Sequence, residues 1–222
     1  PVPASSVTWS SSDPSVTVDA SGNVTAGNTA TVGAAVTVTA TRDGVTATGT
    51  VTVAAPVLTA LAIENAPSAA LPKGRTWPLT ALGTFSDGSS GTVTSGLVWS
   101  STASAVISVT STASGADLLA LSDTGSADLT VSDLSGSVVS APVTVTAGPA
   151  VVDTVAVIAA TIPRGTTQQL SANVTWSDGT QGVVGAGAAW LSDTPANIAA
   201  TGSGTASTPG AVGSSAVVTA TF

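Results

Sequence analysis

The feature that most constrains this chain is a pair of turns that occurs twice at a fixed spacing. Leu71-Pro72-Lys73-Gly74 is followed by Phe85-Ser86-Asp87-Gly88, and Ile162-Pro163-Arg164-Gly165 is followed by Trp176-Ser177-Asp178-Gly179. The second copy lies 91 residues after the first at both ends of the pattern. A fixed offset of this kind indicates that the chain is an array of one repeating module.

A tryptophan recurs in step with these turns, but it occurs three times. Trp9, Trp99 and Trp190 each follow an apolar or small residue, at spacings of 90 and 91 residues. Because the turns occur only twice, residues 1–54 lack the part of the module that carries them. We therefore predict three domains: a partial module at 1–55 without its opening strands, a complete module at 56–148, and a module at 149–222 that lacks its final strand.

The local patterns favour strands throughout. Val36 to Ala40 alternates between apolar and polar residues, and Val45 to Val53 alternates again after Asp43-Gly44, a dipeptide typical of hairpin turns. No stretch shows a sustained helical period with caps at both ends. Short strands separated by turn residues predict an all-β chain, with one β-sandwich in each module.

The same periodicity predicts a core. Leu79, Ala81 and Phe85 share one parity of a strand and therefore one face. The recurring tryptophans are expected to anchor each core, although sugar stacking is the functional alternative. The predicted structural core comprises Trp9, Trp99, Trp190, Leu79, Phe85, Leu170 and Trp176.

Trp77 is the one aromatic residue that we nominate for a contact. Its counterpart in the next repeat is Gln168, so the position accepts a polar residue. Trp77 is expected either at the rim of its module, or against a neighbouring module, or against a carbohydrate.

Charge excludes several classes of partner. The net charge is −8, and the basic residues are four: Arg42, Lys73, Arg75 and Arg164. Nucleic-acid binding requires a cationic footprint, which is missing, and anionic membranes are disfavoured for the same reason. The sequence also has no apolar run long enough to span a membrane. Because it does not begin with Met, we expect a processed product or a piece of a longer protein, with any export signal or anchor outside it.

The residues for most catalytic chemistry are missing. The sequence has no His, Cys or Tyr, which excludes histidine catalysis, cysteine nucleophiles and zinc sites of Cys/His type within this chain. Lys73 is a conceivable base, but Arg164 replaces it in the next repeat, so we expect a solvated residue capping a turn. We predict no enzyme, and no catalytic, cofactor-binding or metal-ligating residues.

Calcium is the one cofactor that we keep as an alternative. The acidic residues are eleven Asp and Glu64, and most of the Asp residues occupy predicted turns, where Asp bonds its own backbone. A calcium site would need several oxygen ligands that converge, and we would expect it near the linkers. The primary expectation is no cofactor.

These motifs resemble a known family. The turns Pro-Lys/Arg-Gly and Phe/Trp-Ser-Asp-Gly, the Val7-Thr8-Trp9-Ser10 landmark and Ser21-Gly22-Asn23-Val24 are similar to bacterial immunoglobulin-like domains of group 2, found in invasin- and intimin-like surface proteins. The resemblance implies tandem immunoglobulin-like (Ig-like) β-sandwiches in a rod, joined by linkers at 54–56 and 147–149. Leu191 departs from the pattern, because it replaces the first Ser after the tryptophan.

The resemblance implies a structural role. We expect a non-catalytic spacer of a bacterial cell-surface or extracellular fibrous protein, such as an adhesin stalk or a surface-layer or filament component. The alternatives are a bacteriophage virion fibre or decoration protein, and a carbohydrate-binding accessory of a secreted enzyme. Expected partners are neighbouring Ig-like modules of the same or adjacent chains, with self-assembly through open sheet edges as the sharper alternative to a simple cut from a longer array.

Overall fold

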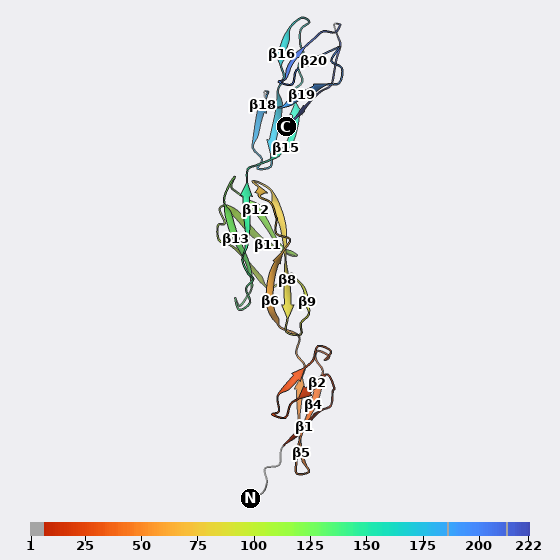
Figure 1. The fold of residues 1–222 in the computed structure, drawn as a ribbon, viewed down its shortest axis with the longest axis vertical. Coiled ribbons are helices and arrows are strands. Elements are labelled where there is room, and N and C mark those ends of the chain that lie inside the picture. Colours follow the sequence, from red (N-terminus) through yellow and green to blue (C-terminus); the bar gives the residue numbers. More distant parts are fainter. Residues whose placement is uncertain (1–6, 186, 212) are drawn as a thin grey trace. The chain divides into compact units, whose positions relative to one another are not determined.

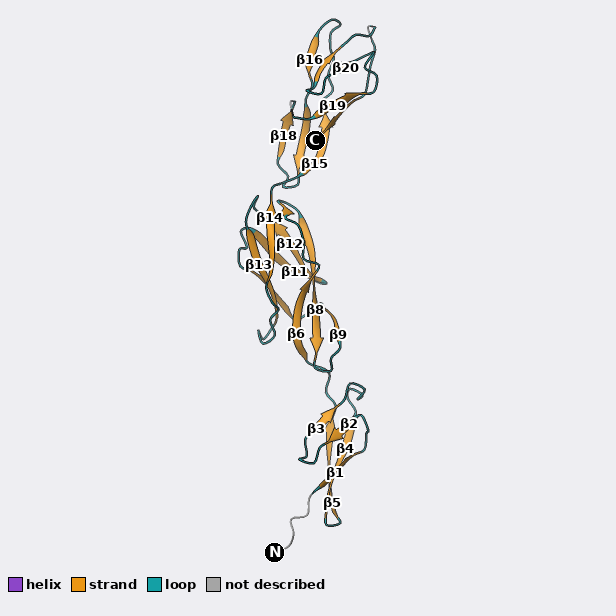
Figure 2. Cartoon of the chain, in the orientation of Figure 1, coloured by secondary structure: helices purple, strands orange, loops and turns teal. Residues whose placement is uncertain are grey.

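A computed structural model describes residues 7–185, 187–211 and 213–222, and every regular element in these ranges is a β-strand (Figures 1 and 2). The predicted all-β class is therefore confirmed. The chain divides into two compact units. One contains residues up to 64, 80–98 and 131–141, and the other contains residues 65–79, 99–130 and 142–222.

The first unit begins with the hairpin that the alternation predicts. Strand β4 (Ala35–Arg42) pairs along its whole length with β5 (Val45–Thr52), and β1 (Thr8–Ser11) pairs with the other edge of β4. The turn residues Asp43 and Gly44 have φ of 52° and 80°, the left-handed pair that a two-residue hairpin turn requires. A short hairpin of β2 (Val16–Val18) and β3 (Val24–Ala26) completes this region.

The core under these strands is small. Val16, Val36 and Val53 form its buried centre. Most residues of β5 are exposed on both faces, so the alternation there produces a strand but no second buried face.

A second region of the same unit is a three-stranded meander. Strand β6 (Leu58–Glu64) pairs with the later part of β8 (Thr76–Phe85), and β9 (Ser90–Val93) pairs with the other side of that part. The predicted turn at Ser86 to Ser89 joins β8 to β9. Asp87 closes it, because its carboxylate accepts hydrogen bonds from the Ser89 amide at 2.9 Å and the Ser89 hydroxyl at 2.6 Å.

The second unit holds the best-buried core. Strand β12 (Gly115–Ala120) pairs with β11 (Ile107–Thr112) and with the first part of β8. Strand β13 (Ser126–Asp133), bordered by β10 (Leu97–Ser101), pairs with β14 (Val143–Gly148), and β14 pairs in parallel with β7 (Leu71–Pro72). The fully buried large side chains here are Leu79, Ile107, Leu118, Leu129 and Val145.

One prediction in this region was wrong in detail. Leu71 and Pro72 were expected in a turn, yet they form β7. Proline is tolerated because the strand lies at a sheet edge, where Gly148 O instead accepts a hydrogen bond from the next amide, Lys73 N, at 2.9 Å. The last strand of this region, β14, begins only at Val143. Ser132 and Val139 form only an isolated bridge.

The rest of the second unit contains three small sheets. Strand β17 (Ala172–Trp176) lies between β15 (Val152–Val157) and β18 (Gln181–Val184). Strand β21 (Thr205–Ser207) lies between β16 (Thr167–Gln169) and β20 (Ala199–Ala200), and β19 (Ala189–Ser192) pairs with β22 (Val218–Thr221). The buried cluster among them comprises Leu170, Ala172, Ala188, Trp190 and Ala206.

Candidate functional site

The candidate site is built from two turns of the second unit. The first, which we call the basic turn, comprises Pro72, Lys73 and Gly74. Its backbone is held on both sides, because Gly148 O accepts from Lys73 N at 2.9 Å and Ala120 O accepts from Gly74 N at 2.8 Å. Pro72 O accepts from the Arg75 amide at 2.9 Å and closes the turn. The backbone that carries the Lys73 side chain is therefore held in place.

The second turn, which we call the acidic turn, comprises Ser177, Asp178 and Gly179 and joins β17 to β18. Asp178 Oδ1 accepts from the amide and the hydroxyl of Thr180 at 3.0 and 2.6 Å. Gly179 has φ of +80°, in the left-handed region that favours glycine. These bonds hold one carboxylate oxygen within the turn and leave the other, Oδ2, to face outward.

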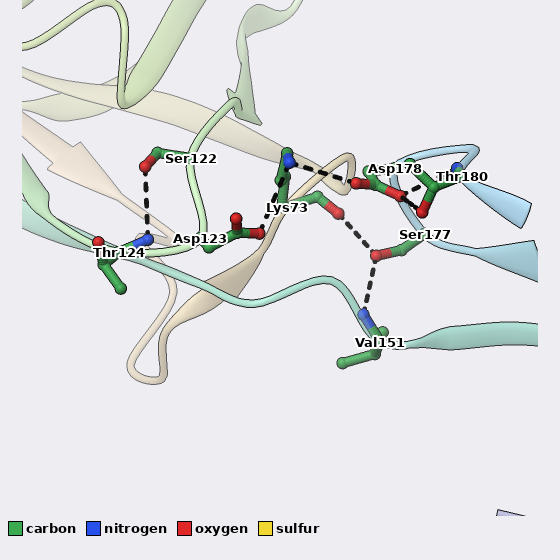
Figure 3. Close-up of polar contacts among 8 residues, drawn as sticks. All are labelled: Lys73, Ser122, Asp123, Thr124, Val151, Ser177, Asp178 and Thr180. Atoms are coloured by element: carbon green, nitrogen blue, oxygen red, sulfur yellow. Dashed lines mark hydrogen bonds and ion pairs between the residues drawn. The ribbon is translucent and has the colours of Figure 1, made fainter. Parts of the chain in front are cut away.

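The two turns are in direct contact (Figure 3). Lys73 Nζ lies 3.3 Å from Asp178 Oδ2. The Ser177 hydroxyl donates to Lys73 O at 2.6 Å and accepts from Val151 N at 3.1 Å. One serine thus joins the backbone of the basic turn to the backbone just beyond the linker at 147–149.

Gly74 is the closest point of this contact. A Cβ added to Gly74 would lie 2.2 Å from Ser177 O and 2.3 Å from Asp178 Cα, far inside contact distance. The backbone conformation also favours glycine, because φ of Gly74 is +80°. Both the backbone conformation at position 74 and the neighbouring turn therefore require glycine there.

The charges reinforce the contact. Lys73 Nζ lies between Asp178 and a second carboxylate, Asp123, whose Oδ1 is 3.6 Å away. The Asp178 side chain is only 10% exposed, whereas that of Asp123 is 60% exposed. The hydrogen bond to Asp178, followed by the charge of Asp123, raises the pKa of Lys73 above its usual value. Hydrogen bonds from Thr180 lower the pKa of Asp178, and Lys73 lowers it further.

The expectation that Lys73 is a solvated turn cap was wrong. Its ammonium bridges two carboxylates, and its side chain is 32% exposed. The replacement of Lys73 by Arg164 in the next repeat argues against a catalytic base, but it does not show whether the cation has a partner. Instead, the observation that a basic turn and an acidic turn recur at the same spacing is the signal that could have revealed the contact.

A second ion pair lies beside the first. Arg75 Nη2 is 2.7 Å from Asp153 Oδ1, at the start of β15. Both side chains are nearly half exposed, so solvent screens the pair and its contribution is small.

The residues predicted for the core differ in burial. Three are buried: Leu79, Leu170 and Trp190. Four are half-buried: Trp9, Trp99, Phe85 and Trp176. We propose that Trp9 and Trp190 anchor their modules through Ser-Gly turns, because a Cβ on Gly22 or Gly204 would lie within 2.8 Å of a tryptophan ring atom.

Trp77 lies in β8, opposite Leu118 of β12. Its indole N–H donates a hydrogen bond to Asn65 O, and Trp77 as a whole residue is 40% exposed. Asn65 has φ of +61°, so this bond supports a left-handed turn residue. The proposed contact with a neighbour or a sugar would have to use the ring face alone.

Within the described ranges, no group of three or more acidic residues is arranged to hold a metal ion. The two carboxylates nearest the linker, Asp123 and Asp178, are bridged by Lys73. The lysine ammonium thus supplies there the positive charge that the calcium alternative would assign to an ion. In the same ranges, no helix is long and apolar enough to cross a membrane.

Comparison with known proteins gives low similarity. No family model matches the chain, and no curated protein matches it. Among solved structures it is similar to domains 1-6 of the surface layer protein SbsC, with 19% identity and a TM-score of 0.34, over 97% of this chain and only 28% of that one. Domains 4 and 5 of the same S-layer protein give 22% identity and a TM-score of 0.35, over 65% and 70% of the two chains. Human protocadherin-24 has 18% sequence identity and a TM-score of 0.35, over 66% of this chain and 83% of that one. These are β-rich, multi-domain proteins.

Proposed function

We propose that this chain is a non-catalytic spacer in a bacterial cell-surface or extracellular fibrous protein, as an adhesin stalk or a surface-layer or filament component. The observation that carries the proposal is the docking of the basic turn on the acidic turn. A spacer must hold successive modules in a defined orientation, and this contact joins what the repeat identifies as two successive modules.

The linker strengthens the argument, because its two ends are held by the same contact. Gly148 O accepts from Lys73 N, and Val151 N donates to Ser177 Oγ. Only Pro149 and Ala150 lie between these anchored groups, and the proline ring fixes one of the remaining dihedral angles. Little backbone freedom is left with which the modules could reorient.

The composition supports the non-catalytic part of the proposal. A chain without His, Cys or Tyr lacks the side chains that most often act as nucleophiles and proton carriers near neutral pH. The resemblance of its motifs to surface-protein modules supports the location.

Immunogold labelling of intact cells of the source organism tests the proposal. Antibodies raised against this chain are expected to label unpermeabilised cells at the surface, whereas antibodies against a cytoplasmic protein label only permeabilised cells. Label that appears only after permeabilisation would contradict a surface role.

A further inference from the structure

The module repeat supplies both turns twice, so the described chain contains a second basic turn. It comprises Pro163, Arg164 and Gly165, at the positions that match Pro72, Lys73 and Gly74. Its backbone has the same form. Pro163 O accepts from Thr166 N at 3.1 Å, as Pro72 O accepts from Arg75 N, and Gly165 has φ of +78° against +80° for Gly74.

The two basic turns differ in what lies against them. The acidic turn packs on Gly74, but a Cβ on Gly165 would meet no atom within 4 Å. Among the described residues, Arg164 has no ion pair, whereas Lys73 pairs with two carboxylates. The neighbouring residues 208–211 and 213–216 include no acidic residue that could take the place of Asp123. The second basic turn is thus formed and open.

A hollow lies beside this open turn. Its volume is about 510 Å³, and its lining includes Ile162, Pro163, Arg164, Asn197 and Thr208. Its lining mixes apolar residues such as Ile162 with polar residues such as Asn197 and Thr208, and Arg164 is its only charged residue. This combination suits a partner that presents a carboxylate on a small projecting turn.

The acidic turn that fits such a site is also repeated. In Ser86-Asp87-Gly88, Asp87 Oδ1 accepts from the amide and hydroxyl of Ser89, as Asp178 Oδ1 accepts from Thr180. Ser86 Oγ accepts from Val57 N at 3.1 Å, as Ser177 Oγ accepts from Val151 N. Hydrogen bonds from Ser89 lower the pKa of Asp87, so this carboxylate is charged at neutral pH. The chain therefore shows twice how such a turn is presented, and once how it docks.

We propose that the Pro163-Arg164-Gly165 turn is a docking site for another Ig-like module, which binds through a Ser-Asp-Gly hairpin turn. The incoming carboxylate pairs with Arg164, the serine hydroxyl donates to Arg164 O, and the turn backbone packs on Gly165. The proposal rests on the spacer function, and it adds the partner and the residues that an array would use to continue from this module. It differs from strand addition at an open sheet edge, because here the turns bind.

The test uses the full-length chain, labelled with ¹⁵N, and a cyclised peptide probe with the sequence of residues 172–184, which form the β17–β18 hairpin. We expect saturable amide shifts at Arg164 and Gly165, with a dissociation constant on the order of 1 mM for so small a contact. Gly74 is the internal control, because its site is already filled and should not shift.

Charge reversal provides the specificity control. The Arg164→Glu variant should weaken binding by about fivefold or more, since an exposed attraction becomes a repulsion. A peptide that carries Lys at the position of Asp178 should not bind the unchanged chain, but it should bind the Arg164→Glu variant.

Absence of saturable shifts at Arg164 and Gly165 would overturn the docking proposal, and so would equal binding of the Asp and Lys peptides. Either result would leave the spacer function standing as long as intact cells are labelled at the surface. Surface labelling therefore tests the spacer function and peptide binding tests the docking site, and one result can be negative without the other.

Discussion

At the scale of single residues, two glycines with the same backbone have different surroundings. Gly74 and Gly165 both have a left-handed φ, so alanine at either position should cost about 1–2 kcal/mol of unfolding free energy. Only at Gly74 would the new Cβ meet the acidic turn. We expect Gly74→Ala to cost a further ~1–3 kcal/mol, as overpacking does, unless the turns separate.

Chemical denaturation of the two alanine variants measures this difference, and the amide resonance of Ser177 shows whether the turns separate. Gly165→Ala is the matched control. Equal losses of stability, with the Ser177 resonance unmoved in both variants, would mean that the contact at Gly74 is not formed in solution.

The serines of the two acidic turns form a second matched pair. Ser177 Oγ makes two hydrogen bonds, to Lys73 O and from Val151 N, whereas among the described residues Ser86 Oγ makes only the bond from Val57 N. At about 0.5–1.5 kcal/mol for each net hydrogen bond, Ser177→Ala should cost about twice as much stability as Ser86→Ala. Thermal unfolding of both variants checks this, and a larger loss for Ser86→Ala would refute it.

At the scale of elements, the turns are fixed by aspartates that bond their own backbone. Asp13, Asp19, Asp87, Asp133 and Asp178 all have a lowered pKa, because neighbouring Ser, Asn or Thr groups donate to each carboxylate. A lowered pKa in the folded state means that the stability is present above the ordinary value of 3.8 and is lost as pH falls through the lower, folded value.

The raised pKa of Lys73 has the opposite sign. Its stabilisation is present below the ordinary value of 10.5 and is lost as pH rises through the higher, folded value. We therefore expect the unfolding free energy to be flat between these limits and to fall at both extremes. Urea denaturation across pH measures the profile. In Asp178→Asn the alkaline fall should be smaller, and an unchanged alkaline limb would contradict the lysine bridge.

The same bridge makes a prediction about calcium. Because the Lys73 ammonium lies between Asp123 and Asp178, a divalent ion there would be repelled by the lysine. We expect the melting temperature to be the same with calcium and with a chelator. A rise with calcium that Asp123→Asn abolishes would show that an ion binds at these carboxylates.

Much of the element scale is readable from the sequence. Alternation and Asp-Gly predicted the β4–β5 hairpin, and the parity of Leu79, Ala81 and Phe85 matches the face of β8 that turns inward. Edge strands such as β7 were missed, because two residues hold no period and Pro72 argues against a strand. Local patterns also carry no information about which turns meet, so Lys73 was assigned to solvent.

At the scale of the whole molecule, the repeat is the strongest predictor of the module organisation. It does not specify which turns come into contact. A basic turn and an acidic turn at a fixed offset form an ion pair only when the fold brings one turn of each kind together. Lys73 and Asp178 are 105 residues apart in the sequence but belong to the same compact unit. The division into three modules stays a proposal drawn from the repeat.

The measurement that tests the central claim most directly is a spin-label distance distribution across the Lys73–Asp178 contact. The chain has no Cys, so Ser111→Cys and Asn173→Cys, two exposed positions on either side of the linker, can be labelled cleanly. Docked turns predict one narrow distance distribution, which should broaden in a Lys73→Ala, Ser177→Ala double variant that loses the ion pair and both serine bonds. A distribution that is broad already in the unaltered chain, and equally broad in the double variant, would contradict a spacer held by these turns.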